Sequence, residues 1–504
     1  MTAVSGDGIG AVVQAAPTPV PVANEGLDRT LVAGVAWTGL FKWSSQALSW
    51  LSTILVARLL TPHDYGIVAM SRVYVDLAQL INEGGFGVTV VQHQDLGRHA
   101  LARLAGLAAA LGLAMGVVSV ALAKPAAMFF GEPAVAAVIV VLSLGLVLEG
   151  LENIGRGFLA RQLRFKELGA IEALQMALNV AITLGLAFWG AGYWALVVGT
   201  IGSTAGGALF VLLRTRLWPR WPGPLRDLML PIKFGAKVLT SNVVWWLYRS
   251  ADITVIGRWL GGTAAGLYSF SYSIAAVPTD RIGQVLGRVA SPILAASQKD
   301  LPALRRYVLR ITEGVSLVTF PLLAGLALVA DNLVRLVLGD KWVPAVPALK
   351  ILAVAGIIRA VMPLMNQLLL ALHEAATVLR STCVLAIAMP VLFVLGTNWG
   401  VSGVASVWLL GYPVIGGFLL LRPALKKVGL HPGHYAQALA PAAVSALVMS
   451  GVVTAVSWVP LQSLVLRLAG QIAAGAAAYI LCLLALWPDR VRTYAELLRG
   501  LLRR

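Results

Sequence analysis

The short sequence TPHDYG (61–66) joins two long apolar runs, residues 30–60 and 65–92. A second pair of apolar runs, residues 231–260 and 264–297, follows 200 residues later. Superposing the pairs at this offset aligns identical residues at several positions, among them Arg58 with Arg258, Leu60 with Leu260, Gly66 with Gly266, Ser71 with Ser271, and Gly87 with Gly287. The shared layout of run, connection and run predicts that the chain consists of two related halves.

Composition indicates a membrane protein. Of the 504 residues, 59% are hydrophobic and 12% are charged, and the mean hydropathy is +0.83. Apolar runs of roughly 20 residues recur almost to the C-terminus, and a run of that length crosses ~30 Å of hydrocarbon as a helix. We therefore predict an all-α polytopic membrane protein with about fourteen helices. Their expected positions are 30–60, 65–92, 101–123, 134–157, 167–189, 193–213, 231–260, 264–297, 308–330, 343–372, 377–397, 401–421, 438–459 and 464–487.

Lysine and arginine residues concentrate in alternate connections between these helices. Because cytoplasmic loops carry an excess of both residues, the connections after even-numbered helices and both termini are predicted to be cytoplasmic. Two basic amphipathic connections, residues 156–168 and 298–310, are expected to lie along the inner membrane surface. The predicted divisions are a disordered tail (1–29), an N-lobe (30–217), a cytoplasmic linker (218–230), a C-lobe (231–425), helices 13 and 14 (426–487) and a basic tail (488–504).

The sequence gives little support to several other classes of function. The basic residues that give the net charge of +17 lie mainly between the apolar runs, where membrane proteins carry anchoring residues, so nucleic-acid binding is not indicated. The only cysteines, Cys383 and Cys482, lie inside apolar segments, which argues against a disulfide framework or a metal cluster. The sequence contains no phosphate-binding Gly-Lys-Ser/Thr loop and no recognisable nucleophile–base constellation. We expect no catalytic residue, no metal site and no cofactor.

Ionisable residues nevertheless fall within the predicted helices, where a charge at the bilayer centre costs ~3 kcal/mol or more. Basic residues facing a cleft would supply counter-charge to an anionic substrate. The candidates for this role are Lys42, Arg72, Lys237, Arg249, Arg288 and Arg359. Asp76 follows Arg72 by four residues and Asp252 follows Arg249 by three, so structural ion pairs are an alternative for these two arginines. Lys42 has no acidic neighbour at that spacing and is expected to face a wet cavity or another helix.

Helix-breaking residues indicate candidate hinges. The sequence NEGGFG places Gly84, Gly85 and Gly87 late in the second helix, and Pro278 falls within the eighth. Membrane helices tolerate such residues, which often mark hinges. Simple kinks that improve packing are an equally good interpretation.

Five segments carry a resemblance to a known family: ARLLTPHDYGIVAM (57–70), GGFGVTVVQ (84–92), ARQLRFKEL (160–168), ADITVIGRWLGGTAAGLYSFSY (251–272) and FPLLAGLALVADNLVRLVLGDKWVPAVPALKIL (320–352). Together they resemble the bacterial polysaccharide exporters of the multidrug/oligosaccharidyl-lipid/polysaccharide (MOP) superfamily. The most similar branch is that of the colanic-acid-type Wzx flippases. The resemblance covers roughly residues 30–425, and the segments come in the order that the family shows.

This resemblance implies a V-shaped bundle of two six-helix lobes with two extra helices, and alternating access through a central cavity. The implied substrate is an oligosaccharide repeat unit on undecaprenyl pyrophosphate, moved to the periplasmic leaflet of the inner membrane for synthesis of exopolysaccharide, capsule or lipopolysaccharide. Membrane lipids and a polysaccharide polymerase or export machinery are the implied partners.

The resemblance also implies roles for individual residues. Family members are thought to use an ion gradient, and Asp76, Asp252 and Asp280 are then the candidates for a proton or sodium site. Residues at the repeated positions of the two halves would serve folding or gating: Arg58, Gly66, Arg258 and Gly266.

Three alternatives stay open at the level of sequence. A peptidoglycan-precursor flippase of the same superfamily would share the helix count and a cationic cavity. A cation-coupled multidrug antiporter would use acidic residues in its cleft, whereas the first helix offers Lys42. A membrane polysaccharide polymerase or ligase would be expected to carry a large periplasmic loop, but the longest predicted one, residues 331–342, is short.

Overall fold

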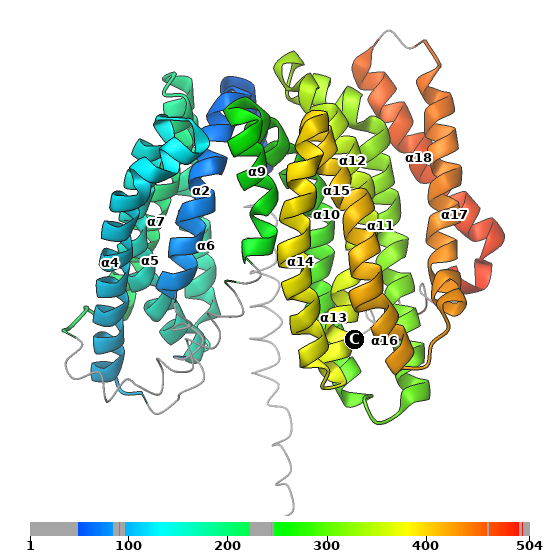
Figure 1. The fold of residues 1–504 in the computed structure, drawn as a ribbon, viewed down its shortest axis with the longest axis horizontal. Coiled ribbons are helices and arrows are strands. Elements are labelled where there is room, and N and C mark those ends of the chain that lie inside the picture. The colour runs from blue at the N-terminus through cyan, green and yellow to red at the C-terminus, as the bar shows by residue number, and fades with distance from the viewer. Residues whose placement is uncertain are drawn as a thin grey trace, which may run out of the picture.

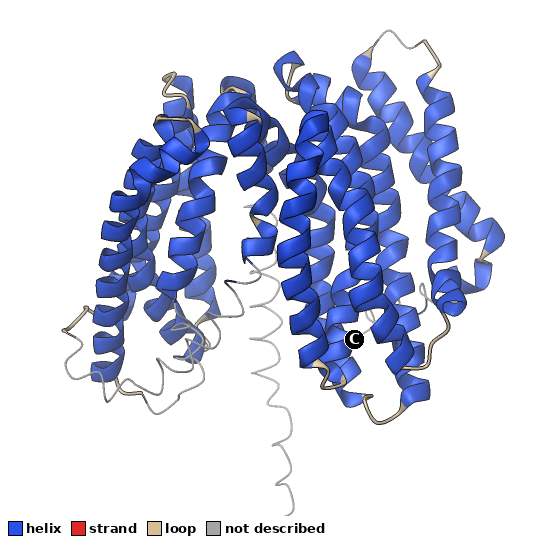
Figure 2. Ribbon diagram, in the orientation of Figure 1, coloured by secondary structure: helices blue, strands red, loops and turns tan. Residues whose placement is uncertain are grey.

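The computed structural model of the chain describes residues 49–83, 90, 96–221, 243, 246–460, 463–492 and 496. Within these residues every regular element is a helix, which confirms the predicted fold class (Figure 1, Figure 2). Nine helical segments of this described part are long and apolar enough to cross a membrane. The count of fourteen spans stays a prediction with which the arrangement agrees.

The first half of the chain forms one group of helices, drawn blue to cyan-green in Figure 1. Its elements are the helix Ser49–Leu59, α2 (Pro62–Glu83), α4 (Arg98–Phe130), α5 (Ala134–Arg161), α6 (Phe165–Phe188) and α7 (Tyr193–Thr215). α5 packs against α4, α2 and α7, and α7 also packs against α6. Small residues let α6 and α7 approach closely, since a Cβ at Gly207 would lie 2.1 Å from the Gln175 side chain.

The second half forms the other group. Its elements are α9 (Ala251–Trp259), α10 (Gly261–Ala296), α11 (Leu301–Val337), the 3₁₀ helix η2 (Asp340–Ala345), α12 (Val346–Arg359), α13 (Met362–Ala371), α14 (Ala375–Gly396), the 3₁₀ helix η3 (Thr397–Trp399), α15 (Gly400–Gly416), the π-helix η4 (Gly417–Leu421), α16 (Arg422–Lys427), α17 (Pro432–Ser457) and α18 (Leu464–Leu486). α17 and α18 pack on each other and on α11, at the edge of the group (Figure 1).

The segment TPHDYG forms the N-terminal cap of α2. The Thr61 hydroxyl accepts from the Asp64 backbone N–H at 3.2 Å, and the Asp64 carboxylate accepts from the Thr61 backbone N–H at 2.8 Å. This reciprocal pair is a capping box, and Pro62 occupies the first helical turn, where its missing N–H is not needed. The sequence at the first predicted connection therefore fixes where α2 begins.

Several helix boundaries differ from the predicted ones. The segment expected as one helix over 343–372 is divided between η2, α12 and α13. α13 starts with proline in its first turn, and Pro363 has no N–H to continue the α12 ladder. Pro278, in contrast, lies inside the continuous helix α10, so the proline does not divide that element.

The two amphipathic connections belong mainly to long helices, and the prediction that they lie along the membrane surface is wrong for most of their length. Residues 301–310 are the first turns of α11, which has 37 residues. Residues 156–161 end α5, and residues 165–168 begin α6. Their charges therefore lie on the ends of membrane helices, where long basic side chains can reach the interface.

The two groups meet at one end of the molecule and diverge toward the other, the V shape implied by the resemblance (Figure 1). They are joined mainly by α2, which packs along α10. The largest buried apolar cluster runs through this contact from α5 to α12, α14 and α15. The predicted linker 218–230 lies mostly outside the described residues, so the lobe boundaries stay a prediction.

Candidate functional site: the junction of the two halves

The helices α2 and α10 touch through glycine at the junction. A Cβ at Gly66 would lie 1.7 Å from the carbonyl oxygen of Gly262, and a Cβ at Gly266 would lie 1.7 Å from that of Pro62. No side chain fits at either distance, so the two backbones are in direct contact. Gly262 and Gly266 form the small-xxx-small spacing that permits close helix packing in membranes. Equivalent residues of the two halves, Gly66 and Gly266, therefore meet.

Polar bonds cap helix ends across the same junction. The last carbonyl groups of a helix have no partner within it. At the end of the helix Ser49–Leu59, Lys341 Nζ donates to the carbonyl oxygens of Arg58 at 2.6 Å and Leu60 at 2.5 Å. At the end of α11, Arg58 donates to the carbonyl oxygens of Val337 at 2.7 Å and Leu336 at 2.5 Å. Each half thus supplies the cation that caps a helix of the other half.

Aromatic rings fill the space around these caps. Trp342 is fully buried, and its Nε1 donates to the Ala57 carbonyl oxygen at 2.8 Å. Its ring centroid lies 4.3 Å from that of Phe270 and 5.3 Å from that of Tyr65. Such ring pairs contribute about 0.5–1.5 kcal/mol each beyond their burial. We call the set Arg58, Gly66, Gly266, Lys341 and Trp342 the seal.

A cavity of about 190 Å³ with charged residues in its walls lies one to two helical turns from the seal, between α2, α10, α9 and the residues 249–250 that precede α9. Its walls include the predicted residues Arg72, Asp76, Arg249 and Asp252. Arg72 also donates to the Thr200 hydroxyl at 3.2 Å. Both Arg72 and Arg249 act electrostatically on Asp76. Asp76 is therefore close enough to one arginine of its own helix and one from the other half to be influenced by both charges.

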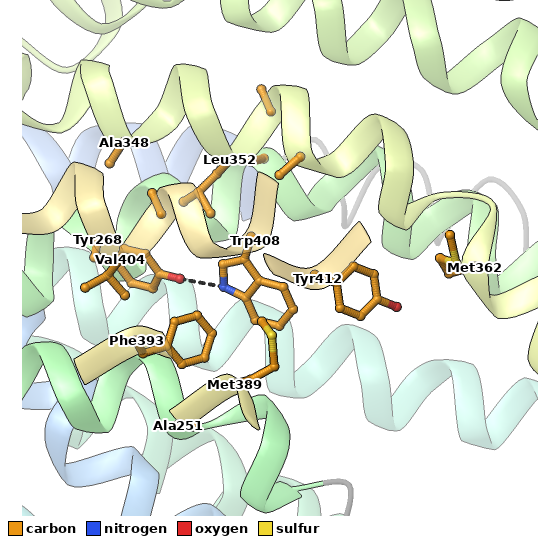
Figure 3. Packing of buried hydrophobic residues seen from close by; sticks show 14 of the residues in the cluster. Ala251, Tyr268, Ala348, Leu352, Met362, Met389, Phe393, Val404, Trp408 and Tyr412 are labelled. Carbon is orange, nitrogen blue, oxygen red and sulfur yellow. Dashed lines mark hydrogen bonds between the residues drawn. The ribbon is translucent and has the colours of Figure 1, made fainter. Parts of the chain in front are cut away.

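Asp252 is bound into an aromatic cage on its buried side. Its carboxylate accepts from the Tyr268 hydroxyl at 2.6 Å, from Trp408 Nε1 at 3.0 Å and from the Ile253 backbone N–H at 2.7 Å. Trp408 Nε1 also donates to the Tyr268 oxygen at 2.9 Å, the bond drawn in Figure 3. These donors satisfy the carboxylate, so it requires no ion pair within its own helix.

Arg359 completes this cage. Its guanidinium carbon lies 4.2 Å from the Trp408 ring centroid, and Nη2 donates to the Tyr272 hydroxyl at 2.6 Å. Arg359 also contributes a favourable charge interaction to Asp252, in addition to the three hydrogen bonds of that carboxylate. The arrangement is a cation–π stack within a packed core, and Arg359 is not among the residues that line the described cavity.

The family described as polysaccharide biosynthesis protein matches residues 55–347, more than half of the chain and the whole of the seal. The chain belongs to this family. It is 27% identical over 482 residues to the teichuronic acid biosynthesis protein TuaB of Bacillus subtilis (strain 168), covering 94% of this chain and 98% of that protein. It is 26% identical over 405 residues to the lipopolysaccharide biosynthesis protein WzxC of Escherichia coli (strain K12), covering 79% of this chain and 82% of that protein.

A solved structure shares the fold. The lipid II flippase MurJ, in an inward closed conformation, superposes with a TM-score of 0.72 at 13% identity, over 90% of this chain and all of that one. At this identity the match concerns the fold alone. It confirms the helical architecture expected from the family resemblance.

The remaining predicted residues have different surroundings in this family member. Asp280 is exposed on α10, and the exposed Arg258 places its guanidinium 5.8 Å from the Phe129 ring centroid. Arg288 lies in α10, but its side chain is outside the described set. Five further candidates also lie outside the described residues: Lys42, Lys237, Gly84, Gly85 and Gly87.

Sequence reasoning missed four residues of the site. Tyr268, Trp408 and Trp342 are aromatic residues in apolar segments, where no periodic signal distinguishes a hydrogen-bonding ring from ordinary core. Lys341 carried a usable signal, since it is one of the few basic residues in the connections predicted to be periplasmic. A cation on the side where the topology rule disfavours it indicates a specific partner.

Proposed function

We propose that the chain is a flippase that moves oligosaccharide repeat units linked to undecaprenyl pyrophosphate across the bacterial inner membrane. It is a transporter and not an enzyme, and its product feeds the synthesis of a surface polysaccharide. The family match and the names of the relatives support this assignment, since both TuaB and WzxC are polysaccharide biosynthesis proteins. The fold shared with a lipid flippase agrees with it.

The proposed mechanism rests on one observation: the seal lies at one end of a cavity whose walls contain arginine. In our proposal the sealed end is periplasmic and both termini are cytoplasmic, because basic residues concentrate at the opposite end. The described conformation is then closed to the periplasm. Release of substrate on that side requires the two halves to separate at Gly66 and Gly266 and to break the caps made by Arg58 and Lys341.

Two of the six candidate cations are placed to meet an anionic substrate. Arg72 and Arg249 come from different halves and line the same cavity. A pyrophosphate bound between them would hold both halves, because guanidinium groups bind phosphate oxygens through paired hydrogen bonds. We assign Arg359 a supporting role, and retain Lys42, Lys237 and Arg288 as further cations of the same pathway.

Asp76 is our first choice for ion coupling. It shares Arg72 and Arg249 with the proposed substrate, so the carboxylate and a pyrophosphate compete for the same cations. A proton or sodium ion on Asp76 would release both arginines to the substrate. Asp252 is held by three donors, and Asp280 is exposed away from this cavity, so they rank lower.

The test uses the native host with the gene deleted. Complementation with the full chain should restore surface polysaccharide, and the variant Arg72→Gln with Arg249→Gln should not, while reaching the membrane in normal amount. Undecaprenyl-linked repeat units should accumulate in the inner leaflet of cells that carry this variant. The matched control is Arg380→Gln, an exposed arginine of α14. Unchanged polysaccharide in the deletion strain, with altered sensitivity to cationic drugs, would favour an antiporter and exclude this proposal.

A further inference from the structure

A second pocket, with several charged residues in its walls, lies away from the junction between α11, α17 and the segment after α18. Its volume is about 400 Å³. α11 contributes Arg306, Leu309, Arg310 and Glu313, whose spacing places them on one face of the helix. The facing walls are His434, Gln437 and Ala438 of α17, with Arg490 from beyond α18. The pocket thus combines three guanidinium groups with one carboxylate and an apolar floor.

The single carboxylate of the pocket has a structural role. Glu313 is almost fully buried, and Arg490 Nη1 donates to it at 2.5 Å. This bond ties the segment after α18 to α11 and so builds one wall of the pocket. Arg306 and Arg310 stand at its exposed rim, four residues apart. The residues around the pocket therefore carry an excess of positive charge.

The position of this pocket matches the level of lipid head groups. A helix rises about 1.5 Å per residue, so α11 with its 37 residues is about 55 Å long, well beyond the ~30 Å of hydrocarbon. The pocket uses residues 306–313, near the N-terminal end of α11, and α17 begins and α18 ends beside it. Under the predicted topology this end faces the cytoplasm.

An apolar pocket adjoins the basic one. It is about 600 Å³ in volume and is lined largely by aliphatic residues, among them Leu421, Leu425 and Leu430. His431 lines this pocket and His434 lines the basic one, and their ring centroids are 6.2 Å apart at the start of α17. Arg422 and Lys426 add two further cations on the side of the second pocket. A basic rim beside an aliphatic groove suits a molecule that is anionic at one end and apolar at the other.

We propose that this pocket binds the phosphate of an anionic phospholipid from the surrounding leaflet. Arg306 and Arg310 hold the phosphate oxygens at the rim, and the acyl chains lie along the neighbouring aliphatic groove. A soluble phosphate would gain nothing from the apolar lining, which is why the lipid is the favoured source. This site is separate from the cavity that contains Arg72 and Arg249, and it does not depend on what the chain transports.

The test measures lipid retention by native mass spectrometry of the purified full chain. Dioleoylphosphatidylglycerol and dioleoylphosphatidylcholine are titrated in parallel, and the first should bind preferentially. Each basic residue near an anionic lipid surface adds to the free energy of lipid binding. Loss of both arginines in Arg306→Gln with Arg310→Gln should therefore weaken phosphatidylglycerol binding about thirtyfold. Lysine at both positions should restore most of it, and Arg380→Gln should bind as the natural chain does.

Equal binding of the two lipids, or unchanged phosphatidylglycerol binding by the double glutamine variant, would overturn the proposal. Inorganic phosphate and glycerol phosphate are added as competitors, and displacement of the lipid by either at equal concentration would assign the site to a free phosphate instead. Both arginines are exposed, so a monodisperse elution profile is expected for every variant and confirms that the fold is intact. Failure of the transport proposal would leave these outcomes unchanged.

Discussion

Replacing Arg58 and Lys341 by glutamine should open the seal between the two halves. These two side chains make four hydrogen bonds to carbonyl oxygens at helix ends, and all four cross from one half to the other. Glutamine can offer a neutral donor but is shorter and uncharged. The helix packing within each half, such as α4 on α5 and α17 on α11, does not involve either side chain, so the fold of each half is expected to be preserved.

The size of the effect follows from the number and exposure of these bonds. A hydrogen bond from a charged donor contributes about 1.5–3 kcal/mol, and the lower value applies because Arg58 is exposed to solvent. Water replaces part of these four hydrogen bonds when the halves separate, so we count half of their summed energy. The variant should therefore lower the stability of the closed state by about 3 kcal/mol relative to the open state. A change of this size moves the closed-to-open ratio by about 150-fold, enough to turn a nearly fully closed population into a mixture.

The assay is double electron–electron resonance between spin labels on the two halves. Leu59 and Asp340 are exposed neighbours of the two substituted residues and suit labelling. The native thiols Cys383 and Cys482 are first replaced by serine. The otherwise unaltered chain should give one short distance. The double variant should add a longer population that is at least comparable in size.

Arg335→Gln is the matched control. This exposed arginine lies at the same end of the molecule, but it pairs with Asp331 at 3.1 Å and with the label site Asp340 at 3.5 Å, both within its own half. Its loss should leave the distance distribution unchanged. If the double variant also kept the single short distance, the caps would not hold the halves together, and the reasoning from crossed helix ends would be refuted.

Three further outcomes are expected. Gly266→Ala should block closure and abolish transport in a complementation assay, because its Cβ would overlap a carbonyl oxygen of α2. The control Gly283→Ala on the same helix should be active, because a Cβ at Gly283 meets nothing within 4 Å. Trp408→Phe removes a donor to two buried oxygens and should destabilise the fold by about 1–3 kcal/mol, seen as a lower melting temperature in detergent. A hydrogen bond from the exposed Lys427 ammonium lowers the pKa of the half-buried Glu374 in the loop before α14. This pair should therefore stabilise the fold above the ordinary carboxyl pKa of 4.5 and cease to do so as the pH falls through the lowered value. Lys427→Gln should remove that pH dependence from thermal melts, and an unchanged profile would contradict the prediction.

The intramembrane charges show how far sequence reasoning reaches into the site. Burial cost predicted that Arg72, Arg249 and Asp76 matter, and the structure brings all three to one cavity. Residues three or four apart on a helix can form an ion pair, which led to the alternative that Asp252 pairs with Arg249. Instead Tyr268 and Trp408 hold its carboxylate. Sequence spacing predicts only partners on the same helix, and these donors come from α10 and α15.

Local and compositional signals determined the membrane environment and the helical class, and they predicted two related halves. Runs of apolar residues permit only helices or closed barrels in lipid, because every backbone polar group must be satisfied within the protein. The capping box at Thr61 and Asp64 likewise rests on residues three positions apart. Such features need no knowledge of distant contacts, so the sequence alone was sufficient.

The tertiary structure alone decided how the halves close on each other. Arg58 reaches a carbonyl 279 residues away, and Lys341 reaches one 283 residues away. The crossing of α2 and α10 places Gly66 beside Gly262 and Gly266, whereas repetition in the sequence predicted only that Gly66 and Gly266 are equivalent positions. Helix ends and glycine surfaces accept many partners. The packing of whole helices selects one, and that choice sets which end of the molecule is sealed.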